Sequence, residues 1–153
     1  MKRFIACVIF IVIAYLPAVI GSQFLPGSWY GTLQKPIWTP PGWIFGPVWT
    51  MLYLMIGISG FLAWEKGDPE KRFRPFTVYG LQLLANTLWS WLFFGLHRPG
   101  FALVDLFLLW LLVLINIALF AGRSRTSAWL LMPYFAWLTF AGALNWAIFR
   151  LNP

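Results

Sequence analysis

Residues 101–120 read FALVDLFLLWLLVLINIALF, an almost unbroken apolar run with a single acid, Asp105, and a single amide, Asn116. Twenty residues of α-helix extend about 30 Å, which matches the hydrocarbon core of a bilayer. A run of this length and composition is typical of a membrane-spanning helix. The stretch therefore predicts that the chain crosses a membrane.

The whole chain has the same apolar character. Of its 153 residues, 61% are hydrophobic and 10% are charged, whereas soluble domains have roughly 45–50% and about 25%. A soluble protein of this length could not bury so much apolar surface, which argues against a soluble enzyme or a disordered chain. The net charge of +7 comes from scattered cations that form no basic stripe, so no nucleic-acid partner is expected.

Five segments are apolar and long enough to be helical crossings. They lie at about 4–21, 46–64, 77–94, 101–120 and 128–149. Turn-forming residues separate them, and none alternates polar and apolar residues as barrel strands do. We predict one all-α domain over 1–153, a bundle of five transmembrane helices in the lipid bilayer. The first segment has the alternative interpretation of a cleaved signal peptide, although its apolar run is longer than usual.

Charged residues at the segment ends predict the orientation. With five crossings, three cations fall on the side of the carboxyl terminus, namely Lys35, Arg98 and Arg150. The other eight fall on the side of the amino terminus: Lys2, Arg3, Lys66, Lys71, Arg72, Arg74, Arg123 and Arg125. Because cytoplasmic loops are rich in Lys and Arg, we expect a cytoplasmic amino terminus and an outside carboxyl terminus.

Conventional catalytic groups are missing from the pattern. The sequence has no metal-ligand cluster, no nucleophile with a base, and no phosphate-binding glycine loop, so neither a catalytic residue, a metal nor a cofactor is predicted. Asp105 is interpreted as a helix-start carboxylate that meets backbone N–H groups or a loop cation. This interpretation disfavours proton-coupled transport.

Three predicted helices carry an aromatic face with a polar group or a small residue. The three sets are Phe45, Trp49 and Tyr53; Gln82, Asn86, Trp89 and Phe93; and Trp137, Ala141, Leu144 and Asn145. Spacings of three and four residues place each set on one face. One interpretation is helix packing with amides as interhelical hydrogen bonds. Taken together, the faces favour a cavity for a flat, largely apolar ligand.

The first loop reads WYGTLQKPIWTPPGW at 29–43 and is unusually rigid and aromatic. Prolines restrict its backbone, and tryptophans favour the membrane interface. We expect a lid over the outer mouth of the bundle. The alternative is an aromatic interfacial belt without a gating role.

Four stretches form a specific combination: WYGTLQKPIWTPPGWIFGPVWTMLY at 29–53, LQLLANTLWSWLFFG at 81–95, ALVDL at 102–106, and MPYFAWLTFAGALN at 132–145. Together they resemble the TspO/MBR family of tryptophan-rich sensory and translocator proteins. The resemblance implies a five-helix bundle, usually a homodimer, with a ligand cavity that opens towards the first loop. It implies porphyrins such as protoporphyrin IX, sterols and synthetic apolar compounds as ligands, with porphyrin a ligand rather than a cofactor.

The resemblance also implies the binding residues. It places Tyr30 and Trp38 in the lid, and the cavity walls at Trp49, Tyr53, Asn86, Trp89, Trp137, Ala141 and Leu144; the aromatic faces add Phe45 and Phe93. The expected function is a tetrapyrrole receptor in porphyrin homeostasis or stress signalling. Two alternatives stay open: transport of porphyrin or sterol, and light-dependent porphyrin degradation, in which Trp49 and Trp137 would be oxidisable neighbours.

One departure from the family bears on the ligand. Animal members carry a sterol motif of the form Leu/Val, Tyr, Lys/Arg near the end of the fifth helix. Residues 144–150 read LNWAIFR and contain no Tyr. This argues for a tetrapyrrole over a sterol, and the charge pattern favours a bacterial cell membrane.

Overall fold

The computed structural model describes residues 1–24 and 26–153, which form helices and, within these ranges, no strand. The α-helices are α1 (Lys2–Gly21), α2 (Gly27–Thr32), α3 (Gly42–Lys66), α4 (Phe73–Ser90), α5 (Pro99–Ala121) and α6 (Arg125–Leu151). A short 3-10 turn, η1 (Pro69–Lys71), precedes α4, and a π-helical turn, η2 (Trp91–Gly95), continues it. The predicted all-α class is confirmed.

The long helices extend beyond the predicted apolar ranges at most of their ends. Hydropathy identifies the apolar part of a helix that can contact lipid. Capping groups determine the residue at which the helix begins. Pro99 occupies the first turn of α5, where its missing N–H costs nothing. The Ser124 side chain caps α6 by accepting a hydrogen bond from the Ser127 backbone N–H.

Four helices, α1, α3, α5 and α6, are long and apolar enough to cross a membrane. The remaining predicted crossing falls on α4 and η2. Its 18-residue helix includes Arg74 as well as Gln82 and Asn86, which are both buried. All three polar residues lower the hydropathy of α4; Gln82 and Asn86 face the interior of the bundle, whereas Arg74 is exposed.

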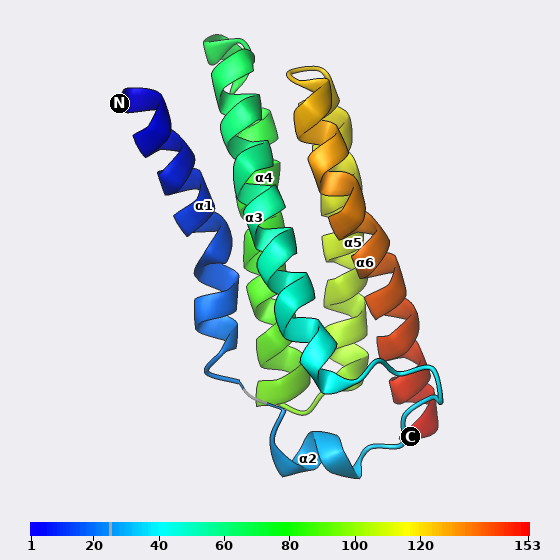
Figure 1. Ribbon diagram of the computed structural model, residues 1–153. Helices are drawn as coiled ribbons and strands as arrows, with labels where there is room; N and C mark the ends of the chain where they lie inside the picture. The colour runs from blue at the N-terminus through cyan, green and yellow to red at the C-terminus, as the bar shows by residue number, and fades with distance from the viewer. Residues whose placement is uncertain (25) are drawn as a thin grey trace.

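The five long helices run side by side in alternating directions, and α2 lies across one end (Figure 1). Contacts between neighbours close a ring in the order α1, α3, α6, α5, α4 and back to α1. The amino terminus lies at one end of the bundle and the carboxyl terminus at the other (Figure 1). The five long helices therefore form a closed ring, and α2 lies at the same end as the carboxyl terminus (Figure 1).

Small residues bring the helices together in the half of the bundle that is remote from α2. A Cβ atom at Gly57 would lie 2.6 Å from the Cα of Ile11, so α1 and α3 are in backbone contact there. Between α3 and α6, Ser59 Oγ donates to the Ser127 carbonyl at 2.8 Å and Ser127 Oγ donates to the Ser59 carbonyl at 2.6 Å. Such pairs allow the close helix approach that membrane interiors favour.

Aromatic rings fill this half. The packed cluster consists of Phe10, Trp64, Phe76, Tyr79 and Phe120. Its ring centroids lie 5.5 Å apart for Phe76 and Phe120, and 5.8 Å apart for the stacked Tyr79 and Phe120. These are normal contact distances for aromatic pairs. The rings therefore occupy the space between α1, α3, α4 and α5 at this end.

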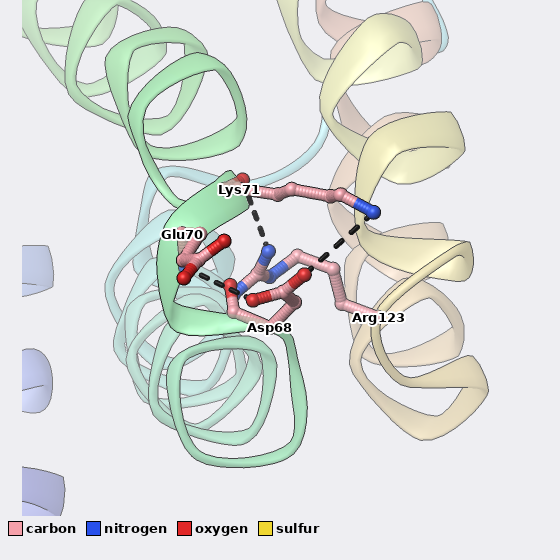
Figure 2. A network of polar contacts seen from close by, with 4 residues as sticks. All are labelled: Asp68, Glu70, Lys71 and Arg123. Atoms are coloured by element: carbon pink, nitrogen blue, oxygen red, sulfur yellow. Dashed lines mark hydrogen bonds and ion pairs between the residues drawn. The ribbon is translucent and has the colours of Figure 1, made fainter.

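Arg123 ties together the two connections beyond the packed cluster (Figure 2). Its guanidinium donates to the carbonyls of Ala63, Asp68 and Lys71 at 3.0, 3.0 and 3.1 Å. The Asp68 carboxylate in turn accepts the Glu70 backbone N–H at 3.0 Å and pairs with Lys71 at 3.6 Å (Figure 2). One charged side chain thus satisfies three carbonyls and holds the α5–α6 turn against the α3–α4 connection.

Candidate ligand-binding cavity

A cavity of about 620 Å³ occupies the half of the bundle nearest to α2. Residues from all five long helices and from the segment 26–41 line it. We call this segment the lid. The volume lies within the roughly 300–1,000 Å³ typical of small-molecule sites.

The cavity brings together ten of the eleven residues that the sequence singles out as ligand-binding. They are Tyr30, Phe45, Trp49, Tyr53, Asn86, Trp89, Phe93, Trp137, Ala141 and Leu144. Trp38 does not line it: its ring is 48% exposed and meets the ring of Phe140 edge-on at 5.9 Å. The binding role of these residues stays a prediction, but their convergence on one space is a structural fact.

A chain of hydrogen bonds crosses the cavity wall between α3, α4 and α6. Tyr53 Oη donates to Asn86 Oδ1 at 2.6 Å, and Asn86 Nδ2 donates to Tyr134 Oη at 3.0 Å. Trp49 stacks on Tyr53 with ring centroids 5.2 Å apart. The Asn86 amide is thus hydrogen-bonded to two tyrosines, and it fixes the position of the Trp49–Tyr53 face of the cavity.

A second polar pair supports the wall between α4 and α6. Trp89 Nε1 donates to Asn145 Oδ1 at 3.0 Å, and Asn145 Nδ2 donates to the Pro99 carbonyl at 2.9 Å. The Trp89 ring stacks on Phe93 with centroids 5.2 Å apart. A buried indole N–H needs such an acceptor, so Asn145 fixes the orientation of the Trp89 face.

The π-helical turn η2 places aromatic rings against the lid. Its hydrogen bond from Leu96 N to the Trp91 carbonyl, at 2.8 Å, spans five residues instead of four. Phe93 and Phe94 thereby both face the cavity, and the Tyr30 ring meets Phe94 edge-on at 5.7 Å. Turns of this kind are frequent at functional sites.

The lid is attached to the bundle at two places. Near its beginning, the Trp29 ring stacks on His97 with centroids 4.2 Å apart and 15° between the planes. Beyond α2, Gln34 N donates to Asn152 Oδ1 at 3.0 Å, and Asn152 Nδ2 donates to the Gln34 carbonyl at 2.9 Å. These contacts attach the lid to the α4–α5 turn and to the end of α6.

Lys35 is the only Lys or Arg that lines the cavity in the described ranges. Its Nζ donates to the Leu33 carbonyl at 3.0 Å and lies 4.6 Å from the centroid of the Tyr30 ring. Burial of Tyr30 raises the pKa of its phenol. The mouth of the cavity thus presents one cation next to a neutral aromatic ring.

Helices α1 and α5 line the cavity with residues that were not predicted. The cavity residues of α1 are Pro17, Ala18 and Gly21, and those of α5 are Leu106 and Leu109. Nothing in an evenly apolar helix marks which face turns inward.

The interpretation of Asp105 as a helix-start carboxylate is wrong. The residue is 6% exposed, α5 has no acid in its first turn, and neither carboxyl oxygen has a hydrogen-bond partner in the described part of the chain. Six residues beyond Pro99, the backbone N–H groups are already used within the helix. Asp105 is therefore a buried acid without a partner.

The structure defines the class of protein: a helical integral membrane protein with an internal aromatic cavity beneath a lid. The chain belongs to the TspO/MBR family, whose model matches residues 5–151. This confirms the resemblance found in the sequence.

Relatives from all domains of life match most of the chain. It is 46% identical over 138 residues to the tryptophan-rich protein TspO of Archaeoglobus fulgidus, covering 86% of this chain and 87% of that one. It is 40% identical over 142 residues to the translocator protein of Homo sapiens, with coverages of 90% and 84%. It is 35% identical over 136 residues to the tryptophan-rich sensory protein of Cereibacter sphaeroides, with coverages of 89% and 84%.

Proposed function

We propose that the protein is a membrane receptor that binds a tetrapyrrole such as protoporphyrin IX in the aromatic cavity, with a role in porphyrin homeostasis or stress signalling. The observation that carries the proposal is the cavity of about 620 Å³ walled by aromatic faces. The names of two relatives, a sensory protein and a translocator protein, agree with a role in which a ligand is recognised.

Ring stacking would supply the affinity. Trp49 on α3 and Trp137 on α6 line the cavity from two different helices, and Trp89 adds a third indole. Each aromatic contact contributes roughly 0.5–1.5 kcal/mol beyond the burial of its area. Since Asn86 and Asn145 hold Tyr53 and Trp89 in place, the faces are preorganised and little side-chain entropy is lost on binding.

Lys35 would recognise the acidic edge of the ligand. Among the described residues its ammonium group has one acceptor, the Leu33 carbonyl, so N–H donors remain for a carboxylate at the mouth. Arg98 and Arg150 do not line the cavity. We therefore assign to Lys35 the pairing with a porphyrin propionate.

Titration of protoporphyrin IX into detergent-purified protein in the dark, followed by tryptophan quenching, tests this function. Saturable quenching that is weakened in Trp137→Phe supports the receptor. Trp129→Phe is the matched control, because Trp129 is 71% exposed on α6 and does not line the cavity. Quenching that does not saturate, or that is equally affected by both variants, would refute the proposal.

A second candidate is light-driven oxidation of bound porphyrin by molecular oxygen. It is supported by the presence of two oxidisable indoles, Trp49 and Trp137, in the cavity walls. Under illumination, protein-dependent bleaching that slows in Trp49→Phe and Trp137→Phe would favour this enzyme. Bleaching at the wild-type rate in both variants would exclude a part for these side chains.

We propose a bacterial cell membrane with a cytoplasmic amino terminus, and the homodimer stays a prediction. The amino terminus and the α3–α4 and α5–α6 connections lie at the end remote from α2 (Figure 1). Glu70 belongs to the first of these connections and Arg123 to the second. In a Cys7→Ser background, a membrane-impermeant maleimide applied to intact cells should label Gln34→Cys and not Glu70→Cys. Labelling of Glu70→Cys and not of Gln34→Cys would show that the amino terminus lies outside the cell.

A further inference from the structure

Asp105 is the buried ionisable group that the proposed receptor does not use. It lies about 9 Å inside α5, counted from Pro99 at 1.5 Å per residue. Its side chain is 6% exposed, and both carboxyl oxygens lack a partner among the described residues. An unpaired charge at membrane depth is costly, and such residues in membrane proteins usually mark a functional site.

Helix register places Asp105 opposite Asn86, one turn of α4 away from Gln82. Asn116 Nδ2 donates to the Pro75 carbonyl at 3.2 Å and anchors α5 against the antiparallel α4. Eleven residues are about three helical turns, so a residue eleven positions away lies on the same face of its helix. Because the two helices are antiparallel, eleven residues forward on α4 and eleven back on α5 reach the same depth in the bundle. This step leads from Pro75 to Asn86 on α4 and from Asn116 to Asp105 on α5.

Gln82 lies one turn from Asn86 on the same face of α4. It is fully buried, and both its Nε2 and its Oε1 lack a partner within the described chain. An amide offers a donor and an acceptor from one side chain. It can therefore donate a hydrogen bond to an ionised carboxylate or accept one from a neutral carboxylic acid.

The hydrogen-bond chain from the cavity points towards the same place. Tyr53 donates to Asn86, and Asn86 donates to Tyr134. In the described part of the chain the Tyr134 hydroxyl accepts from Asn86 and donates to no acceptor. Because the register places Asn86 opposite Asp105, this hydroxyl lies on the side of the carboxyl group that has no donor.

Within residues 1–24 and 26–153, the elements packed against Asp105 bring it no counter-ion. At this depth α4 presents Gln82 and Asn86, α6 presents Tyr134, and α3 adds Tyr53 through Asn86. Tyr79 is the remaining titratable side chain of the interior, one turn further along α4. Neither of the ion pairs in the described ranges involves Asp105.

We propose that Asp105 is a proton-binding site, and that Tyr134 and Asn86 link its protonation to the occupancy of the aromatic cavity. The linkage rests on the proposed receptor function, because Tyr53 and Asn86 also line the cavity. The carboxylate takes one proton from bulk solvent and forms one O–H bond. No other bond changes.

The two protonation states require different hydrogen bonds. Rotation of the Asp105 and Gln82 side chains, which have no partner among the described residues, would let the ionised carboxylate accept from the Tyr134 hydroxyl and from Gln82 Nε2. The neutral acid would instead donate to Gln82 Oε1 and release Tyr134. Because an amide does not readily pass a proton on, Asn86 acts by orienting the two tyrosine hydroxyls. A ligand that engages Tyr53 therefore changes the donor that reaches Asp105.

Infrared spectroscopy of the ligand-free protein tests the proton site itself. The wild type should show a carboxylic-acid C=O band that decreases from mildly acidic to mildly alkaline pH. The band should be absent in Asp105→Asn, a near-isosteric change, and retained in Glu70→Gln, which neutralises an exposed acid on η1. A spectrum in which Asp105→Asn removes no band would overturn the proposal whether or not the cavity binds a ligand.

The linkage is tested with protoporphyrin IX dimethyl ester, which carries no ionisable propionate. In the wild type, linkage to one proton should add a pH dependence of up to about tenfold in Kd per pH unit. This added dependence should be absent in Asp105→Asn. Tyr134→Phe should keep the infrared band and lose the extra pH dependence. Equal pH dependence in all three proteins would overturn the linkage. Absence of saturable binding in every protein would refute the receptor and the linkage together, and the infrared result would still decide the proton site.

Discussion

The two halves of the bundle are both rich in aromatic residues, yet one is filled and the other is hollow. In the half remote from α2, a Cβ atom at Gly57 would lie 2.6 Å from Ile11 Cα, and one at Gly60 would lie 2.9 Å from the ring of Tyr79. In the half next to α2, a Cβ atom at Gly42 or Gly46 would meet nothing within 4 Å. Glycine thus allows close helix contact at Gly57 and Gly60 and borders open space at Gly42 and Gly46.

The difference teaches that aromatic content alone does not make a cavity. In the filled half the rings of the packed cluster contact one another across four helices. In the hollow half, amide hydrogen bonds hold rings against the walls, as Asn86 does for Tyr53 and Asn145 does for Trp89. Rings that are bonded to their own wall cannot collapse into the central space.

The largest expected effect compares the glycines of the two halves. Gly57→Ala should lower the free energy of unfolding by about 1–3 kcal/mol, because the added methyl group forces α1 away from α3. Gly46→Ala should leave stability unchanged or raise it, since the methyl group enters open space and alanine favours helix. Thermal unfolding in detergent measures both. An equal loss of unfolding free energy in Gly57→Ala and Gly46→Ala would contradict the difference between the filled and the hollow half.

A larger side chain in the cavity wall should weaken ligand binding and leave the stability of the protein unchanged. Ala141→Thr adds two heavy atoms to the cavity wall and should raise the Kd for protoporphyrin IX about tenfold, which is about 1.4 kcal/mol. Ala143→Thr, at an exposed position on the same helix, is the control. A folded Ala141→Thr protein with wild-type affinity would place the ligand elsewhere.

A smaller effect concerns the charge at the mouth. Lys35→Gln should weaken protoporphyrin IX binding by two- to fivefold, since partly exposed ion pairs contribute about 0.2–1 kcal/mol. The dimethyl ester should bind both proteins equally, because it has no carboxylate to pair. Parallel titrations of the acid and the ester would show this, and an equal loss for both ligands would contradict the pairing.

The smallest effect is kinetic. Asn152→Ala removes both hydrogen bonds between the lid and the end of α6, and it should speed association and dissociation about twofold. Stopped-flow quenching measures the two rates, with Kd nearly constant. Unchanged rates would favour the original alternative, in which the first loop is an interfacial belt without a gating role.

Much of the fold and the cavity could be predicted because periodicity carries the information. Uninterrupted apolar runs indicate helices, and spacings of three or four residues place Trp49 with Tyr53 and Asn86 with Trp89 on common faces. The same spacing put Ala141 and Leu144 on one face of the last predicted helix. All six of these residues line the cavity.

The remaining features depend on tertiary contacts that no local pattern records. Trp38 has the same Pro-rich surroundings as the rest of the lid, but it packs outside against Phe140. The evenly apolar α1 gave no sign that Ala18 and Gly21 face the cavity. Asp105 was misinterpreted because a sequence does not show whether an acid near the start of a helix finds a partner.

The most direct test of the hollow half uses the indole N–H resonances of ¹⁵N-labelled protein on addition of protoporphyrin IX. The tryptophans should respond according to their half of the bundle. The account predicts that Trp49, Trp89 and Trp137 shift, since they line the cavity, and that Trp64 of the packed cluster and the exposed Trp129 do not. Shifts at Trp64 or Trp129 with silence at the three cavity residues would contradict it.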